Sequence, residues 1–326
     1  MRTLAIAIVG CGRMGRERAR CVRQLNHRIR FVVDTNAARA GELAREYNAV
    51  VMGDVRDCLS SGVDAVFLCT PPGLRGAVLD SCLQHVVPFF VEKPIAVSTF
   101  QCEELAERIR NTPVIHAVGF MNRYRRSVQF GKKVLAGRKV IAITAHWICS
   151  RYNVPWVDNE QLSGGPYNDQ AIHAVDLSRF FAGQVGEVQS IFQSPERAGW
   201  LLAFESGTIA SVVYSCEART KNIGFQIFTE QGALRFEGWD FKLAENTIDG
   251  TLPEYSDEDV FLTETKAFMN AVQSGLRDGL LSDMPDAMET QLVIDAARQS
   301  HASGNRVNIA EFVASRTRQA ALCIAE

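Results

Sequence analysis

The chain has 326 residues, of which 47% are apolar and 22% charged, and its 35 Lys and Arg against 37 Asp and Glu give a formal net charge of -2. This length predicts about two domains, each large enough to bury a core. The balanced charge offers no cationic field for nucleic acid or an anionic membrane, and no apolar run approaches the roughly 18 residues of a membrane span. Neither nucleic acid nor a membrane is expected as a partner.

The start of the chain and its cysteines indicate a cytoplasmic protein. Met1, Arg2 and Thr3 lead straight into an apolar run, without the long apolar region and small-residue cleavage site of an export signal. The nine cysteines form no C-x-x-C pair, so we expect reduced thiols that pack as small apolar side chains. They are Cys11, Cys21, Cys58, Cys69, Cys82, Cys102, Cys149, Cys216 and Cys323.

The first 120 residues alternate short apolar runs with amphipathic stretches, which is typical of parallel strands and helices. Most of the apolar runs are apolar throughout, as strands covered by helices on both faces are. The pattern predicts a doubly wound α/β sheet in a domain spanning residues 1–122. Its strands are expected at 4–9, 29–33, 63–69, 87–91 and 114–120, and its helices at 14–25, 37–47, 73–85 and 98–110.

The pattern changes after residue 122, where longer runs begin to alternate polar and apolar residues. Alternation indicates a sheet with one covered face and one face free for a partner or substrate. We predict a second, α+β domain over residues 123–326, packed against the first because no long linker separates them. Its helices are expected at 127–135, 259–274 and 286–303, and its strands at 140–149, 188–193, 201–204, 208–216, 224–229 and 233–237.

A glycine-rich turn between the first predicted strand and helix indicates a dinucleotide site. The run Gly10-Cys11-Gly12-Arg13-Met14-Gly15 has the G-x-G-x-x-G spacing, and Asp34 ends the second strand, roughly 20 residues later, as the motif requires. The glycines allow a tight turn, a close approach to a pyrophosphate and close packing of helix on strand. The helix N-terminus then supplies free N–H groups to the phosphates. The alternative is a glycine turn in an α/β fold that binds no nucleotide.

The residues at the end of the second strand favour NAD over NADP. Asp34, followed by Thr35, would accept hydrogen bonds from the adenine ribose hydroxyls, and its charge would repel a 2′-phosphate. Arg39 follows five residues after Asp34 and leaves NADP open as the alternative cofactor, because an arginine there can reach a phosphate.

Two further loops are expected where ligands bind in open α/β sheets, beyond the carboxyl ends of the strands. They are Cys69-Thr70-Pro71-Pro72 and Glu92-Lys93-Pro94, and both are candidates for the nicotinamide end. Lys93 is one of only seven lysines and follows an apolar run. An ammonium group near a substrate oxygen stabilises the charge that develops during hydride transfer. The alternative is an ion pair between Lys93 and a local acid.

A glycine turn at Gly164 leads into a predicted helix that carries two polar candidates. Asp169 and His173 are four residues apart, so they share one helical face. Histidine is the natural base for an alcohol proton near neutral pH, and an acid one turn away can orient it or relay the proton. Asp176 could support the histidine from behind. The alternative is an acid at a helix N-terminus and an ordinary packed histidine.

Together these residues resemble the glucose-fructose oxidoreductase / inositol dehydrogenase / MocA (Gfo/Idh/MocA) family of NAD(P)-dependent sugar and cyclitol oxidoreductases, over nearly the whole chain. The resemblance implies a Rossmann domain followed by a domain with a large, open-faced, mostly antiparallel sheet that often forms homodimers or homotetramers. It also implies that Lys93, Asp169 and His173 form the catalytic group. It rests on the glycine motif, Thr70-Pro71, Glu92-Lys93-Pro94, Gly119-Phe120-Met121-Asn122-Arg123-Tyr124, and Gly164-Gly165 with Asp169, His173 and Asp176.

The chain departs from the family pattern at three places. Pro166-Tyr167-Asn168 replaces a glycine and an aliphatic residue, Arg75 stands where a histidine is common, and Asn122 stands where a second arginine is common. The identity of the sugar or cyclitol therefore does not transfer by analogy. Aromatic rings stack on sugars and amides bind hydroxyls, although the tryptophans could equally belong to the core. The candidates for substrate contact are Lys93, Arg123, Trp147, Arg151, Trp156, Tyr167, Asn168, Asp169 and His173.

These observations predict an NAD-dependent dehydrogenase or reductase acting on a secondary hydroxyl of a sugar, sugar derivative or cyclitol. His173 would take the proton, Asp169 would orient it or relay that proton, and Lys93 would hold the substrate oxygen in a cleft between the two predicted domains. No metal is expected, because the lysine supplies the electrophile. Two alternatives stay open: a hydrolase or lyase that recycles bound NAD, and a nonenzymatic NAD-sensing regulator on the same fold.

Overall fold

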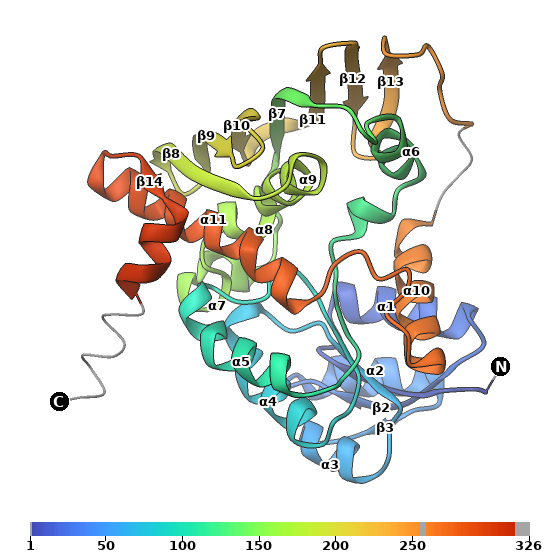
Figure 1. Ribbon diagram of the computed structural model, residues 1–326. Helices are drawn as coiled ribbons and strands as arrows, with labels where there is room; N and C mark the ends of the chain where they lie inside the picture. The colour runs from blue at the N-terminus through green and yellow to red at the C-terminus, as the bar shows by residue number, and fades with distance from the viewer. Residues whose placement is uncertain (1, 255–258, 317–326) are drawn as a thin grey trace. The chain divides into compact units, whose positions relative to one another are not determined.

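Six strands of the N-terminal half form one parallel sheet in the order β3-β2-β1-β4-β5-β6. The computed structural model describes residues 2–254 and 259–316 (Figure 1). The central strands are buried almost throughout, which explains their continuous apolar sequences. The predicted doubly wound sheet is confirmed. The strands are β1 (Ala5–Val9), β2 (Arg28–Val33), β3 (Val50–Val51), β4 (Ala65–Leu68), β5 (Phe89–Val91) and β6 (His116–Val118).

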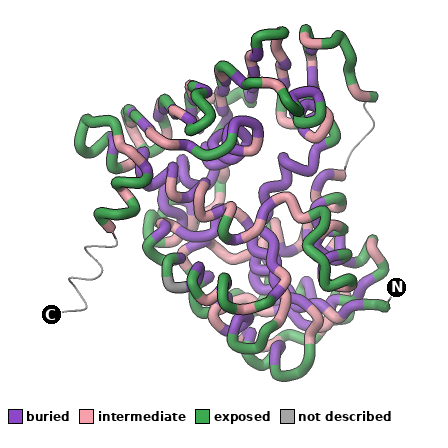
Figure 2. The backbone as a smooth tube through the Cα atoms, in the orientation of Figure 1, coloured by how far each residue is buried: buried purple, intermediate pink, exposed green. Residues whose placement is uncertain are grey.

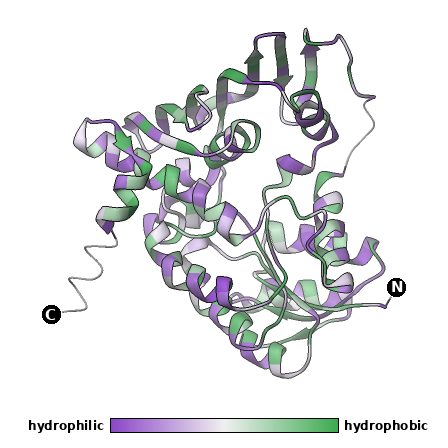
Figure 3. Ribbon diagram, viewed as in Figure 1, coloured by the Kyte–Doolittle hydropathy of each residue, from purple (hydrophilic) through white to green (hydrophobic). Residues whose placement is uncertain are grey.

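Five helices connect these strands. The sequence missed β3 and α3, because both are too short to show a period. The predicted helices at 73–85 and 98–110 each open with a separate 3-10 turn, Pro72–Leu74 and Thr99–Cys102, before the α-helix begins. The helices are α1 (Arg13–Gln24), α2 (Ala37–Tyr47), α3 (Val55–Ser60), α4 (Gly76–Gln84) and α5 (Glu103–Asn111). In Figure 3 the strands of this sheet are mainly hydrophobic, whereas α4 and α5 carry polar outer residues.

A helix from far downstream completes one face of this sheet. α10 (Val260–Ser274) lies beside α1 in Figure 1, and Phe268 packs edge-on against Phe67 at 5.3 Å between ring centroids. Phe268 and Met269 belong to the same buried cluster as Ile6 and Ile8 of β1. The amphipathic pattern at 259–274 predicts a helix but does not say which sheet the helix covers. The helix falls within residues 123–326, the stretch predicted as the C-terminal domain, yet its buried side chains pack on the parallel sheet of the first unit.

The chain divides into two units that do not follow one cut in the sequence. A single boundary at residue 122 would put everything after it in the second domain. Two later segments group with the first unit instead, one around α7 (Glu160–Ser163) and one containing α10. The first unit comprises Met1–Tyr124, Asn159–Gly164 and Asp257–Met288, and the second comprises Arg125–Asp158, Gly165–Ser256 and Glu289–Glu326.

The second unit is built on an eight-stranded mixed sheet in the order β13-β12-β11-β7-β10-β9-β8-β14. Only β7 and β10 pair in parallel among these neighbours, so the sheet is mostly antiparallel, as expected. β13 and β14 escaped prediction because they are short. The strands are β7 (Val140–Ser150), β8 (Val185–Ser194), β9 (Arg197–Phe204), β10 (Ile209–Ser215), β11 (Glu217–Thr229), β12 (Gly232–Glu237), β13 (Lys242–Asn246) and β14 (Val307–Asn308).

One face of this mixed sheet is covered and the other is open. Along β10 buried residues such as Val212 alternate with exposed residues such as Val213, as the sequence predicted. α9 packs on β7 and β10 and is buried along most of its length (Figure 2). α6 (Arg126–Val134), α8 (Pro166–Gln170) and α11 (Met284–Ser303) also contribute residues to this unit, α9 spans Ile172–Ala182, and residues 309–316 are helical as well. None of the helices in the described part of the chain is long and apolar enough to cross a membrane.

Candidate active site

The glycine turn has the geometry that a dinucleotide pyrophosphate requires. Gly10 has a φ of +93°, and a Cβ there would lie 2.7 Å from the carbonyl carbon of Cys69. A Cβ on Gly15 would overlap the carbonyl oxygen of Gly10. Gly12 is the N-cap of α1, no described side chain caps that helix, and a Cβ on Gly12 would meet no atom within 4 Å. The α1 N-terminus therefore offers open N–H groups to an anion, which fits NAD.

Asp34 is fixed by the turn that it faces. Its Oδ2 accepts a hydrogen bond from the backbone N–H of Cys11 at 2.7 Å, and its Oδ1 accepts one from the N–H of Asn36 at 2.7 Å. The Arg39 guanidinium also donates to Oδ1, at 3.2 Å. The carboxylate is thus positioned next to the glycine turn, while Thr35 and Arg13 are exposed and Met14 is half-buried.

The cysteines of this region are packed and protonated, as predicted. The eight described cysteines are free, and all except the half-buried Cys69 are buried; Cys323 lies outside the described residues. Burial, with the charge of Asp34 nearby, raises the pKa of the Cys11 thiol to about 12. Burial likewise raises the pKa of Cys82 to about 12. Neither Cys11 nor Cys82 is therefore a nucleophile near neutral pH.

The loops after β4 and β5 lie at the same edge of the sheet as the glycine turn, because β1, β4 and β5 are parallel neighbours. Thr70 and Pro71 follow β4, and Lys93 follows β5 as a half-buried residue. The buried Arg75 bridges the two loops: its Nε donates to the Thr70 carbonyl at 3.0 Å, and its Nη1 donates to the carbonyls of Glu92 and Pro94. The parallel sheet and Arg75 together hold the backbone at Lys93 at the same sheet edge as the glycine turn.

In the second unit, His173 is buried and stacks on a tryptophan. Its ring lies 5.0 Å from that of Trp147, with 18° between the ring planes. Asp169 ends up on α8 and His173 on α9, since the predicted single helix is interrupted at Ala171. Ala171 keeps right-handed helical angles, so the four-residue spacing still brings both side chains to similar sides of the backbone. Asp176, also buried, accepts a hydrogen bond from the Thr290 hydroxyl at 3.4 Å.

Several candidates for substrate contact are occupied within their own unit. Trp147 has no exposed surface, and its ring packs on His173, so the expectation that it stacks on a sugar needs correction. Asn168 is equally buried, and its Oδ1 accepts from Gln291 at 2.9 Å. The guanidinium of the buried Arg123 donates to the Leu281 carbonyl at 2.6 Å. These contacts tie all three side chains to the protein.

Two of the remaining candidates, Arg151 and Trp156, are less enclosed. Arg151 is exposed and pairs with Asp158 and with Glu196, the latter at 3.3 Å. Trp156 is half-buried, and Tyr167 is buried edge-on against Phe192 at 5.0 Å between ring centroids. Arg151 and Trp156 therefore keep surface that a ligand can reach.

Sequence reasoning missed an aromatic residue that adjoins this cluster. The half-buried Trp239 packs edge-on against Trp147 at 6.0 Å, and the Lys221 ammonium lies 4.3 Å from the Trp239 ring centroid. Trp239 follows a glycine turn between β12 and β13, where sequence periodicity gives no signal. Because it is only half-buried, Trp239 is a better candidate than the fully buried Trp147 for contact with a sugar.

Comparison with known proteins decides the family. Residues 4–120 match the GFO_IDH_MocA family, described as an oxidoreductase family with an NAD-binding Rossmann fold, and residues 138–235 match the GFO/IDH/MocA C-terminal domain. The chain belongs to the Gfo/Idh/MocA family. This Gfo/Idh/MocA protein is an NAD-binding oxidoreductase, as the sequence motifs predicted.

Individual relatives cover nearly the whole chain at low identity. The scyllo-inositol 2-dehydrogenase (NAD(+)) of Bacillus subtilis is 24% identical over 330 residues, which cover 93% of this chain and 95% of that protein. An oxidoreductase domain protein from Kribbella flavida has a TM-score of 0.85 at 18% identity, covering 95% of this chain and 100% of that one. A protein of gentamicin A biosynthesis in complex with NAD has a TM-score of 0.82 at 21% identity, covering 94% and 97%. At these identities the solved structures support the fold.

Proposed function

We propose that this oxidoreductase transfers a hydride between NAD and a secondary hydroxyl, or the corresponding ketone, of a sugar, sugar derivative or cyclitol. The observation that carries the proposal is the position of Lys93, directly after β5 at the sheet edge that also holds the glycine turn and Thr70. A lysine at that edge can place its ammonium beside the carbon that loses the hydride. The name of the Bacillus subtilis relative supports a cyclitol as one candidate substrate.

The proposed chemistry uses three side chains, those of Lys93, Asp169 and His173. In the oxidation direction the Lys93 ammonium binds the substrate oxygen and stabilises its developing charge. The imidazole of His173 takes the hydroxyl proton, and Asp169 orients the ring or passes that proton on. Bound NAD supplies the hydride acceptor.

The residues proposed to hold NAD are those of the glycine turn and the neighbouring loops. Backbone N–H groups of the turn and of the α1 N-terminus would bind the pyrophosphate. Asp34 would accept from the adenine ribose, and Arg39, which shares the Asp34 carboxylate, keeps NADP as the alternative. Cys69, Thr70, Pro71, Glu92 and Lys93 would form the nicotinamide end.

A substrate panel tests the proposal directly. Myo-inositol, scyllo-inositol, aldoses, nucleotide sugars and sugar phosphates are each incubated with NAD or NADP while the absorbance of the reduced cofactor is followed. Lys93→Met is expected to abolish turnover and to keep NADH binding, because only the ammonium is lost. Lys266→Met, at an exposed lysine on α10 of the same unit, is the matched control and keeps wild-type turnover.

Four results would contradict parts of the proposal. Substantial turnover by Lys93→Met would refute the role of the lysine. Preference for NADP would contradict the proposed role of Asp34. A glycoside that is cleaved without any change in cofactor absorbance would favour the NAD-recycling hydrolase or lyase, and no reaction across the panel would favour the NAD-sensing regulator.

We also propose that the chain assembles through the open face of the mixed sheet, as a homodimer or homotetramer. That face presents Leu201, Ile209 and Val213, each more than half exposed, on the neighbouring strands β9 and β10. Contiguous exposed apolar side chains of this kind are typical of a protein interface. The covered face of the same strands has no such surface, because Leu202, Ala210 and Val212 are buried.

A further inference from the structure

Two buried arginines bracket the turn that carries Lys93. Arg18 reaches the Glu92 side chain from α1, and Arg75 reaches the backbone of Glu92 and Pro94 from the start of α4. We propose that Arg18 and Arg75 are positioning residues for Lys93, one fixing the carboxylate and the other fixing the backbone of the turn from which the lysine projects. The inference rests on the proposed function, since it takes Lys93 to act on the substrate.

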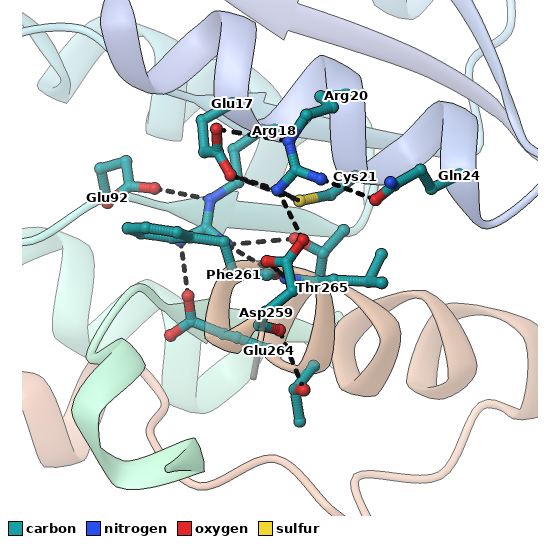
Figure 4. A network of polar contacts seen from close by, with 12 residues as sticks. Glu17, Arg18, Arg20, Cys21, Gln24, Glu92, Asp259, Phe261, Glu264 and Thr265 are labelled. Atoms are coloured by element: carbon teal, nitrogen blue, oxygen red, sulfur yellow. Dashed lines mark hydrogen bonds and ion pairs between the residues drawn. The ribbon is translucent and has the colours of Figure 1, made fainter. Parts of the chain in front are cut away.

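Arg18 has no exposed surface and uses all of its guanidinium nitrogens (Figure 4). Its Nε donates to Glu92 Oε1 at 2.7 Å, and its Nη2 donates to Glu264 Oε2 at 2.5 Å. Its Nη1 donates to the Thr265 hydroxyl at 3.1 Å and lies 3.4 Å from the Phe261 carbonyl oxygen. One side chain therefore connects α1, the end of β5 and α10.

The surroundings of Arg18 hold its guanidinium in one orientation. Its guanidinium carbon lies 4.3 Å from the ring centroid of Phe90. Phe90 belongs to β5 and precedes Glu92 by two residues. Burial by itself would lower the pKa of Arg18, but the charges of Glu92 and Glu264 outweigh it and raise that pKa above its usual value. A planar fork that binds two carboxylates in different directions is a property of arginine that lysine lacks. The position of the Glu92 carboxylate is thus set by a rigid group.

Arg75 holds the same turn through its main chain. Its Nε and Nη2 donate to the Thr70 carbonyl at 3.0 and 2.6 Å, and its Nη1 donates to the carbonyls on both sides of Lys93, those of Glu92 and Pro94. Backbone carbonyls at strand ends need partners when they are buried. Arg75 supplies them from one side chain and joins the Thr70 loop to the lysine turn.

Gly119 leaves the space in which this arrangement fits. A Cβ on Gly119 would lie 2.8 Å from Glu92 Oε2 and 3.3 Å from Arg18 Nη2. The glycine follows β6, the strand beside β5, and its N–H donates to the Val91 carbonyl at 2.9 Å. A single methyl group at this position would press on the Glu92 carboxylate without removing any charge.

The test compares Arg18→Lys and Arg75→Lys with Arg16→Lys. Arg16 is the matched control because it lies on the same helix as Arg18 but pairs at the surface with Glu42, at 2.6 Å, and Glu46, at 3.3 Å. NADH fluorescence titration counts the binding sites, so kcat is expressed per NADH-binding chain and a loss of folded protein does not affect it. The substrate is the panel compound with the highest wild-type turnover, used with hydrogen and with deuterium on its carbinol carbon.

We expect Arg18→Lys and Arg75→Lys to lower kcat per NADH-binding chain at least tenfold, with the dissociation constant of NADH within twofold of wild type. The deuterium isotope effect on kcat is expected to stay at or above the wild-type value, because hydride transfer is the step that slows. Arg16→Lys is expected to match wild type. A loss of less than fivefold in both buried-arginine variants overturns the inference.

The inference can still be tested if Arg18→Lys fails to fold. If Arg18→Lys binds no NADH, Gly119→Ala takes its place under the same fivefold criterion. If Lys93→Met retains turnover, the proposed function fails and the inference falls with it. If Lys93→Met is inactive while the arginine and glycine variants all match wild type, the proposed function stands and only the positioning role is wrong.

Discussion

Each of the two units buries a histidine against an aromatic ring, but the surroundings of the two rings differ. His116, on β6 of the first unit, stacks on Phe89 at 5.7 Å, and the Arg277 guanidinium lies 3.2 Å from its Nε2. His173, on α9 of the second unit, stacks on Trp147 and has aspartates four residues before it and three residues after it in the sequence. Burial alone therefore does not decide what a histidine does.

The surroundings of His116 explain why its ring stays neutral. Burial, together with the positive charge of Arg277, lowers the pKa of His116 to about 4, and its Nδ1 accepts the backbone N–H of Met284 at 3.3 Å. A ring held in this way is a neutral structural acceptor. Asp169 and Asp176 precede and follow His173 by four and three residues in the sequence, a spacing at which helical side chains can meet, and a nearby carboxylate suits a general base. The contacts of His116 support a structural role for it, whereas the proposed function makes His173 the reactive histidine.

The largest effect is expected from the second-unit histidine. His173→Gln should lower kcat by about 10²- to 10⁴-fold, the usual contribution of a general base, and should leave NADH binding within twofold of wild type. His146→Gln is the matched control, because His146 lies next to Trp147 on β7 but bonds Asn222 at 2.8 Å. Steady-state kinetics with the best substrate of the panel decide the matter. If His173→Gln loses no more activity than His146→Gln, both histidines are structural.

The first unit was largely predictable because its motifs determine the path of the backbone around the candidate site. The doubly wound sheet, the glycine turn at Gly10 to Gly15 and the placement of Lys93 after a strand all follow from sequence patterns that report backbone geometry. The spacing of Asp34 is part of the same motif. What the sequence could not supply was the partner of each buried charge, such as the pairing of Arg18 with Glu264 across 246 positions.

The second unit was less predictable because its candidate site is made of packed side chains. The spacing of Asp169 and His173 is visible in the sequence, but the stack of His173 on Trp147 and the contact of Trp147 with Trp239 join separate elements. A buried tryptophan and a ligand-facing tryptophan look alike in sequence. The burial of Trp147 favours the core alternative over contact with the sugar, and the catalytic roles stay a prediction.

A smaller effect, on stability, is expected from the first-unit histidine. Because its folded pKa is about 4 against an ordinary 6.5, the unfolded chain binds a proton between these values that the folded chain does not. Stability is therefore complete above pH 6.5 and falls as the pH drops toward 4, by about 2 kcal/mol at pH 5 from this group. His116→Gln, which keeps an acceptor for Met284, should remove that part of the pH dependence.

Urea unfolding at pH 5 and pH 8 measures this contribution for wild type and variant. His85→Gln serves as the control, because His85 is an exposed histidine of the same unit, and it should unfold as wild type does at both pH values. An equal loss of stability on acidification in wild type and His116→Gln would show that His116 is not held neutral. The contrast between the two buried histidines would then be lost.

The smallest effect on folding is expected at the open face of the second unit. Substitutions at two adjacent residues of β10 test assembly and stability separately. Val213 is 52% exposed and Val212 is 1% exposed, on opposite faces of the same strand. Val213→Lys should change the free energy of unfolding by no more than about 0.5 kcal/mol, as surface substitutions do, yet lower the mass of the assembly in light scattering because it places a charge in the proposed interface. Val212→Lys should instead unfold the unit, since it buries an unpaired charge. If Val213→Lys keeps the wild-type assembly mass, or if the wild type is a monomer, this face is not the interface, and its apolar residues need another explanation than self-association.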